Sequence, residues 1–166
     1  MNCLAHCLDE VLDNAWGHHI PRPLVIGKFT LMAGVHPGKV NDWFLGMYVD
    51  AVDWVTAPNV IGMSQHADHG VVGTKPYVAS GKYIDRMSNY CKGCRYDVRE
   101  RVGDDACPYN TLYWDFLIRH REDFADNRRM GIAVANVDRL DDDERAAIQS
   151  RARKLRGEWG VGGISR

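Results

Sequence analysis

Three cysteines in one short stretch constrain what this chain can fold into more than any other feature of the sequence. Cys91 and Cys94 are separated by two residues, and Cys107, followed by Pro108, comes after a further twelve. Two thiolates at this spacing can turn onto one metal while a third arrives from a short loop. Five cysteines without a secretory signal favour metal ligands over a disulfide framework, with buried structural cysteines as the alternative. The stretch is therefore predicted to close around a metal centre.

The residues alone leave the fourth ligand open. Cys3 and Cys7 stand four positions apart on one face of an expected helix, and either could complete the site. The metal is open as well, because four thiolates suit structural zinc as well as an iron-sulfur cluster. The Cys107-Pro108 step favours iron and sulfur, as in ferredoxin-type sequences.

The rest of the chain is predicted to be all-α. Its 166 residues, 45% hydrophobic and 26% charged, suit one globular domain. Apolar residues recur at helical spacing over 1–16, 20–34, 36–55, 81–90, 109–124 and 141–156, and no strand is expected. Residues 57–78 are broken by Gly and Pro and are predicted to form a long functional loop. We expect a domain of residues 1–156 and a flexible tail of residues 157–166.

The charge balance excludes a strongly basic, histone-like nucleic-acid binder, because 21 Lys and Arg residues meet 22 Asp and Glu residues. A local patch around the cysteines could still meet phosphates, or could be ordinary exposed surface. Its members are Lys92, Arg95, Arg99 and Arg101. No run of about 18 apolar residues could span a bilayer, and the polar start MNCLAHCLDE does not resemble a signal peptide. We therefore expect a cytoplasmic monomer.

Two histidine pairs are further candidates. His18 and His19, with Arg22 one turn later, could donate a proton to a ligand, or could form a surface or capping pair. His66 and His69 lie in the long loop with no fourth ligand nearby, so we expect no metal there.

Several long motifs carry a resemblance to a known family. They are GHHIPR (17–22), DWFLGMYVDAVDWVTAPNVIGMSQHAD (42–68) and KPYVASGKYIDRMSNYCKGCRYDVRERVGDDACPYNTLYWDFL (75–117). Over residues 1–127 the chain resembles the iron-sulfur bacterial cryptochromes and photolyases, also called prokaryotic (6-4) photolyases. The resemblance implies the C-terminal helical FAD-binding and iron-sulfur domain of that family, truncated at its N-terminus.

The resemblance also implies an activity. Members of the family repair (6-4) photoproducts in UV-damaged DNA by light-driven electron donation from reduced FAD, which makes them lyases, and they carry a lumazine antenna in an N-terminal domain. That domain and the first flavin-binding helices would be missing here. We therefore expect the chain to hold one wall of the flavin pocket and to need the missing part for repair.

Site residues follow from the resemblance position by position. The cluster ligands of the family fall on Cys3, Cys91, Cys94 and Cys107, which implies a 4Fe-4S cluster and leaves Cys7 as a spare thiol.

The catalytic positions of the family fall on His18 and His19, which would face the lesion, and on Trp43 of the photoreduction path, where the next residue is Phe44 and not the frequent tyrosine. The second histidine would be the proton donor. The flavin-facing set implied by the resemblance is Trp43, Asp50, Thr56, Asn59 and Met63. Met63 lies in the stretch that faces the lesion, and Thr56 stands where a glutamate is expected.

Two other functions remain open. The chain could be an iron-sulfur DNA-binding module without catalysis, similar to the cluster domain of the primase large subunit. It could also be a blue-light receptor.

Overall fold

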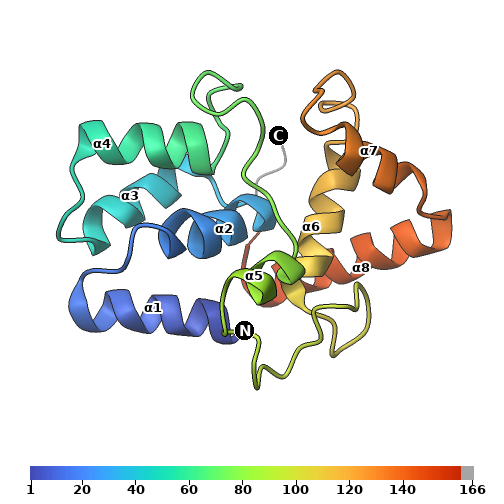
Figure 1. Ribbon diagram of the computed structural model, residues 1–166, viewed down its shortest axis with the longest axis horizontal. Helices are drawn as coiled ribbons and strands as arrows, with labels where there is room; N and C mark the ends of the chain where they lie inside the picture. The colour runs from blue at the N-terminus through green and yellow to red at the C-terminus, as the bar shows by residue number, and fades with distance from the viewer. Residues whose placement is uncertain (162–166) are drawn as a thin grey trace. The chain divides into compact units, whose positions relative to one another are not determined.

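The computed structural model describes residues 1–161, which form helices and loops without a strand (Figure 1). An isolated bridge between Asp97 and Ala106 is the extended pairing found in this range. The prediction of an all-α chain is confirmed for these residues. The described residues divide into two compact units, residues 1–78 and residues 79–161.

The first unit is built around two π-helical segments. Its elements are α1 (Asn2–Asn14), η1 (Arg22–Gly27), α2 (Lys28–Ala33), α3 (Pro37–Met47), α4 (Asp53–Ala57) and η2 (Pro58–Ser64). η1 contacts α1, α2 and η2, while η2 contacts α3, α4 and η1. The two π-helical segments therefore form the centre of this unit.

Local chemistry explains the helix boundaries in the first unit. Gly34 ends α2 with φ 83°, a left-handed conformation that glycine adopts without steric strain. His36 caps α3, because its Nδ1 accepts a hydrogen bond from Gly38 N at 3.1 Å, and Pro37 occupies the first helical position. α1 buries Cys3, Cys7 and Val11, which share one face at four-residue spacing.

The predicted loop of residues 57–78 begins later than expected, because residues 58–64 belong to η2. Gly62 is a packing residue here and not a helix breaker, since a Cβ at this position would lie 2.8 Å from Asp68 Oδ2 and from Val72 Cγ2. Asp68 then folds the chain back by accepting hydrogen bonds from Gly70 N and Val72 N.

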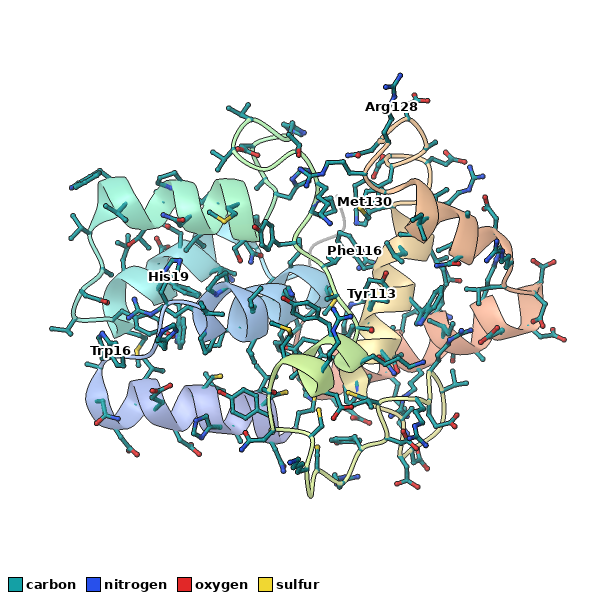
Figure 2. The ribbon with its side chains drawn as sticks, viewed as in Figure 1. Trp16, His19, Tyr113, Phe116, Arg128 and Met130 are labelled. Atoms are coloured by element: carbon teal, nitrogen blue, oxygen red, sulfur yellow. The ribbon has the colours of Figure 1, made fainter. Side chains whose placement is uncertain are left out.

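The second unit is organised by one buried helix. Its elements are α5 (Gly81–Met87), α6 (Pro108–Arg119), α7 (Gly131–Asp138) and α8 (Asp142–Glu158). α6 contacts each of the other three. Its core residues include Tyr109, Leu112 and Phe116, and α8 supplies Ile148 and Ala152. Figure 2 shows Tyr113 and Phe116 on this helix.

α6 and α8 are also joined by charge. Asp115 on α6 is 2% exposed and pairs with Arg119 at 2.9 Å and with Arg156 of α8. α8 continues to Glu158, into the tail predicted for residues 157–166, of which 162–166 lie outside the described range. Among the helices of residues 1–161, none combines the length and the apolar character of a membrane span.

Candidate functional site

A cavity of about 160 Å³ lies within the first unit. Its wall comes from the start of η1 with the segment before it, from the end of α3 with the loop that follows, and from α4 with η2. The lining residues are His19, Arg22, Pro23, Phe44, Tyr48, Asp50, Ala51, Val55, Thr56, Asn59, Val60, Met63 and Ser64.

Arg22 holds one side of the cavity together. Its guanidinium makes a bidentate ion pair with Asp50, at 2.8 and 2.9 Å, and its Nε donates to the backbone oxygen of Gly17 at 2.8 Å. The same guanidinium lies 3.9 Å from the centre of the Tyr48 ring. Hydrogen bonds from Arg22 lower the pKa of Asp50 below its ordinary value, so Asp50 is a carboxylate at neutral pH. One cation thus orders an acid and a phenol that both face the cavity.

Three aromatic rings pack at this wall. The rings of Phe44 and Tyr48, which line the cavity, lie 5.3 Å apart. Trp43 meets each of them edge-on, at 5.4 and 5.9 Å between ring centres. Burial raises the pKa of Tyr48 to about 12, against the opposing charge of Arg22, so its phenol keeps its proton at neutral pH.

The cavity brings together five residues that the family resemblance assigned to a site. They are His19, Asp50, Thr56, Asn59 and Met63. The other two residues of the catalytic and flavin-facing sets, His18 and Trp43, do not line it. His18 is exposed, and its Nδ1 accepts a hydrogen bond from Ile20 N at 3.2 Å, while Trp43 lies against the wall residues Phe44 and Tyr48. His19 lies in the exposed segment before η1 (Figure 2).

The roles of Arg22 and Tyr48 are not apparent from the sequence. Arg22 stands out there only as a neighbour of the histidines, and Tyr48 is one aromatic among several near α3. Their contacts join residues 28 and 26 positions apart, from Arg22 to Asp50 and to Tyr48. The available signal is the position of Arg22 inside the GHHIPR motif, which marks the residue without naming its partner.

Three of the five cysteines belong to the second unit, in a stretch without helix. Cys94 N donates to Cys91 O at 3.1 Å in a turn, and Gly93 between them has φ 73°. The stretch returns on itself through Asp97 N to Asp105 O at 2.7 Å and Cys107 N to Asp97 O at 2.9 Å. Cys107 then starts α6 as its N-terminal cap residue.

The thiols of this stretch lie in surroundings that disfavour isolated thiolates. Burial raises the pKa of Cys91 to about 11, and the charges of Asp85, Cys107 and Cys94 add to the rise. Burial also raises the pKa of Cys107, opposed by the backbone N–H groups of Tyr109 and Asn110 at the start of α6. A bound cation would reverse this balance, because metal ligation requires and stabilises the thiolate.

The absence of a side chain at Gly81 leaves room for the Cys107 sulfur. A Cβ at Gly81 would lie 2.9 Å from Cys107 Sγ, so any other residue at the start of α5 would displace that sulfur. Cys3 and Cys7 are buried on α1 in the first unit. Within residues 1–161 no three His, Cys, Asp or Glu side chains are grouped as a single metal ion requires. The four-cysteine ligand set stays a prediction.

The predicted basic patch is only partly exposed. Arg101 pairs with Glu144 of α8 and lies 4.3 Å from the centre of the Trp114 ring. Lys92, Arg95 and Arg99 are exposed, with Arg95 stacked 4.7 Å from the ring centre of Tyr96.

Comparison with known proteins defines the class. No family model matches the chain. The chain is 52% identical over 152 residues to a (6-4) photolyase of Agrobacterium fabrum, which covers 92% of this chain and 30% of that protein. It is 32% identical over 101 residues to the uncharacterized protein R855 of Acanthamoeba polyphaga mimivirus, covering 61% of this chain and 75% of that one.

The chain belongs to the photolyase family. Within that family its similarity is to a (6-4) photolyase, of whose length it spans about 30%.

Proposed function

We propose that this chain forms the flavin-facing and cluster-bearing part of a (6-4) photolyase, in which light drives an electron from reduced FAD into a UV photoproduct in DNA. One observation carries the proposal most directly. Residues that the family resemblance assigns to flavin and lesion, spread from His19 to Met63, line one cavity. Because the chain spans about 30% of its (6-4) photolyase relative, we propose that repair needs further family segments.

The cavity fits part of a flavin site. At about 160 Å³ it is smaller than the roughly 300–1,000 Å³ typical of ligand pockets, which agrees with one wall of a flavin pocket. Its polar groups suit a flavin ring edge. Asp50 would accept from a ring N–H with the lone pairs that Arg22 leaves, and the Thr56 hydroxyl would donate or accept. Reduced FAD, when bound, would supply the light-driven electron.

The chain's own residues would then handle the proton and the geometry. His19, exposed beside the cavity, would donate a proton to the photoproduct, and Met63 would pack against it. Arg22 would hold Asp50 in place. Trp43 would pass electrons toward the cavity through Phe44 or Tyr48, which line the cavity and meet the Trp43 ring edge-on.

The proposal includes a 4Fe-4S cluster held by Cys3, Cys91, Cys94 and Cys107. Thiolates are the ligands that iron-sulfur clusters use. Cys3 and Cys107 are buried, and Cys91 and Cys94 are half-buried, which suits a cluster shielded from solvent.

Iron and sulfide content tests the cluster. Anaerobically purified chain should contain iron and acid-labile sulfide and show the broad brown absorption of a cluster. Cys91→Ser should lose both and should unfold more easily than the parent chain, because ligation also stabilises the fold. Cys7→Ser is the matched control, a buried cysteine on α1 beside Cys3, and should keep both. Bleaching by Cys7→Ser alone would show the ligand set to be wrong.

Flavin binding is tested separately. FAD fluorescence should be quenched on titration with the chain, which gives a dissociation constant. Asn59→Ala or Asp50→Asn should raise that dissociation constant about tenfold, the factor that corresponds to about 1.4 kcal/mol. Thr74→Ala is the control, because Thr74 lies outside the cavity lining, and this variant should bind FAD as the parent chain does. Equal quenching in all variants would contradict the proposed pocket.

A further inference from the structure

Residues 128–161 lie beyond the motifs that carry the family resemblance, yet α8 reaches back to the cysteine stretch through Arg151. Its Nη2 donates to Ala106 O at 3.1 Å and to Asp104 O at 3.3 Å. Its Nε donates to Thr111 Oγ1 on α6 at 3.3 Å. The Arg151 side chain is 12% exposed, and its bonds to Ala106 O and Thr111 Oγ1 are partly buried, whereas the bond to Asp104 O is exposed.

Side chains of α6 also bind the cysteine stretch through hydrogen bonds. Thr111 Oγ1 donates to Arg101 O at 2.7 Å. The Asn110 side chain donates to Val98 O and to Glu100 O, and it accepts from Gly81 N at 2.9 Å. Backbone carbonyls of a stretch without helix are thus satisfied by side chains, as buried polar groups require.

Arg151 has a particular place in this network. Ala106, whose carbonyl it binds, directly precedes Cys107, and Cys107 N itself donates to Asp97 O at 2.9 Å. Thr111, the third partner, lies one turn into the helix that Cys107 caps. One guanidinium therefore fixes the chain on both sides of Cys107.

We propose that Arg151 is a positioning residue that sets the place of the Cys107 sulfur, and through it the retention of the cluster. Its effect on the cluster rests on the proposed function. Its effect on the sulfur concerns this chain alone.

The test measures how fast Cys107 reacts with iodoacetamide in the metal-free full chain, followed by peptide mass spectrometry. Arg151→Ala should speed alkylation of Cys107 about tenfold, which corresponds to about 1.4 kcal/mol. Arg151→Lys should fall between that variant and the parent chain, because an ammonium can bind a carbonyl but lacks the planar fork that spans several acceptors. If Arg151→Ala does not fold, the alkylation rate of Cys107 in Arg151→Lys still tests whether Arg151 positions the sulfur.

Two matched controls separate positioning from general loosening. Arg153→Ala removes an exposed arginine of the same helix, and Arg156→Ala breaks the ion pair with Asp115, which ties α8 to α6 away from the cysteine stretch. Both should leave Cys107 reactivity near that of the parent chain. A parent-like rate in Arg151→Ala and Arg151→Lys, or an equal rise in Arg156→Ala, would overturn the inference.

The second readout is cluster release. In iron-loaded chain exposed to a chelator, Arg151→Ala should lose its brown absorption about tenfold faster than Arg153→Ala, the same factor of about 1.4 kcal/mol. If the parent chain holds no iron, the proposed cluster fails, and Cys107 alkylation still decides the role of Arg151.

Discussion

Lys28 is a cation buried at the start of α2, with 4% of its surface exposed. Burial lowers its pKa from 10.5 to about 8, and the like charge of Lys75 adds to the shift. A lysine at an interior position loses hydration of its charged form, and folding is opposed by that loss whenever the amine is protonated. The stability of the first unit should therefore depend on alkaline pH in a defined direction.

Between pH 8 and 10.5 the folded chain has released the Lys28 proton while the unfolded chain still holds it. The unfolded state binds more protons in that window, so the free energy of unfolding rises with pH there. Between these two pH values, the free energy of unfolding of the parent chain should rise by on the order of 2–3 kcal/mol relative to that of Lys28→Met.

Urea unfolding at several pH values measures this gain. Lys39→Met, at a position on α3 that is less buried than Lys28, is the control and should follow the parent chain throughout. A constant difference between the parent chain and Lys28→Met would show that Lys28 keeps its proton in the folded state.

At the scale of elements, the π-helical segments η1 and η2 depend on close approach. A Cβ at Gly27 would lie 2.1 Å from Ser64 Oγ and 3.3 Å from Ser64 Cβ. Gly27→Ala should therefore lower the free energy of unfolding by about 1–3 kcal/mol, the range for overpacked cores. Chemical denaturation gives the value.

Gly46→Ala is the matched control for Gly27→Ala. Gly46 lies in α3 with nothing within 4 Å of an added Cβ, so the substitution should be neutral or should stabilise by about 0.4–1 kcal/mol. Ser64→Ala in the Gly27→Ala background should recover part of the loss. Equal effects of the two alanines would mean that η1 and η2 do not pack as closely as described.

Helices could be predicted from the sequence where the spacing of apolar residues and the residue types at the helix ends agree. α1, α3, α6 and α8 each overlap a predicted helix, and the cysteine stretch lacks helix as its spacing implied. α7 was missed because its sequence, GIAVANVD, is apolar on nearly every side and shows no stripe. η2 was missed because Pro58 and Gly62 resemble breakers, whereas Gly62 is required by tertiary contact. Local patterns cannot report such contacts.

For the site too, sequence motifs could be recognised, whereas contacts between distant segments could not. Membership of the photolyase family could be inferred from the sequence motifs, and it is confirmed. The five assigned residues that line the cavity were found by that resemblance and not by spacing. The links from Arg22 to Asp50 and from Arg151 to Ala106 join distant segments, and only coordinates reveal them.

At the scale of the whole molecule, the proposed ligand set has a consequence for stability. Cys3 belongs to the first compact unit, while Cys91, Cys94 and Cys107 belong to the second. A cluster bound by all four would add its free energy of ligation to the stability of the folded chain. Loading with iron should therefore raise the temperature at which the chain unfolds.

We therefore expect the iron-loaded chain to unfold at a higher temperature than the metal-free chain in calorimetry. Cys3→Ser should lose most of that rise even when iron is offered, because one of the four ligands is gone. Cys7→Ser, which alters a buried thiol of the same helix, should behave as the parent chain does. A rise in Cys3→Ser equal to that of the parent chain would remove Cys3 from the ligand set.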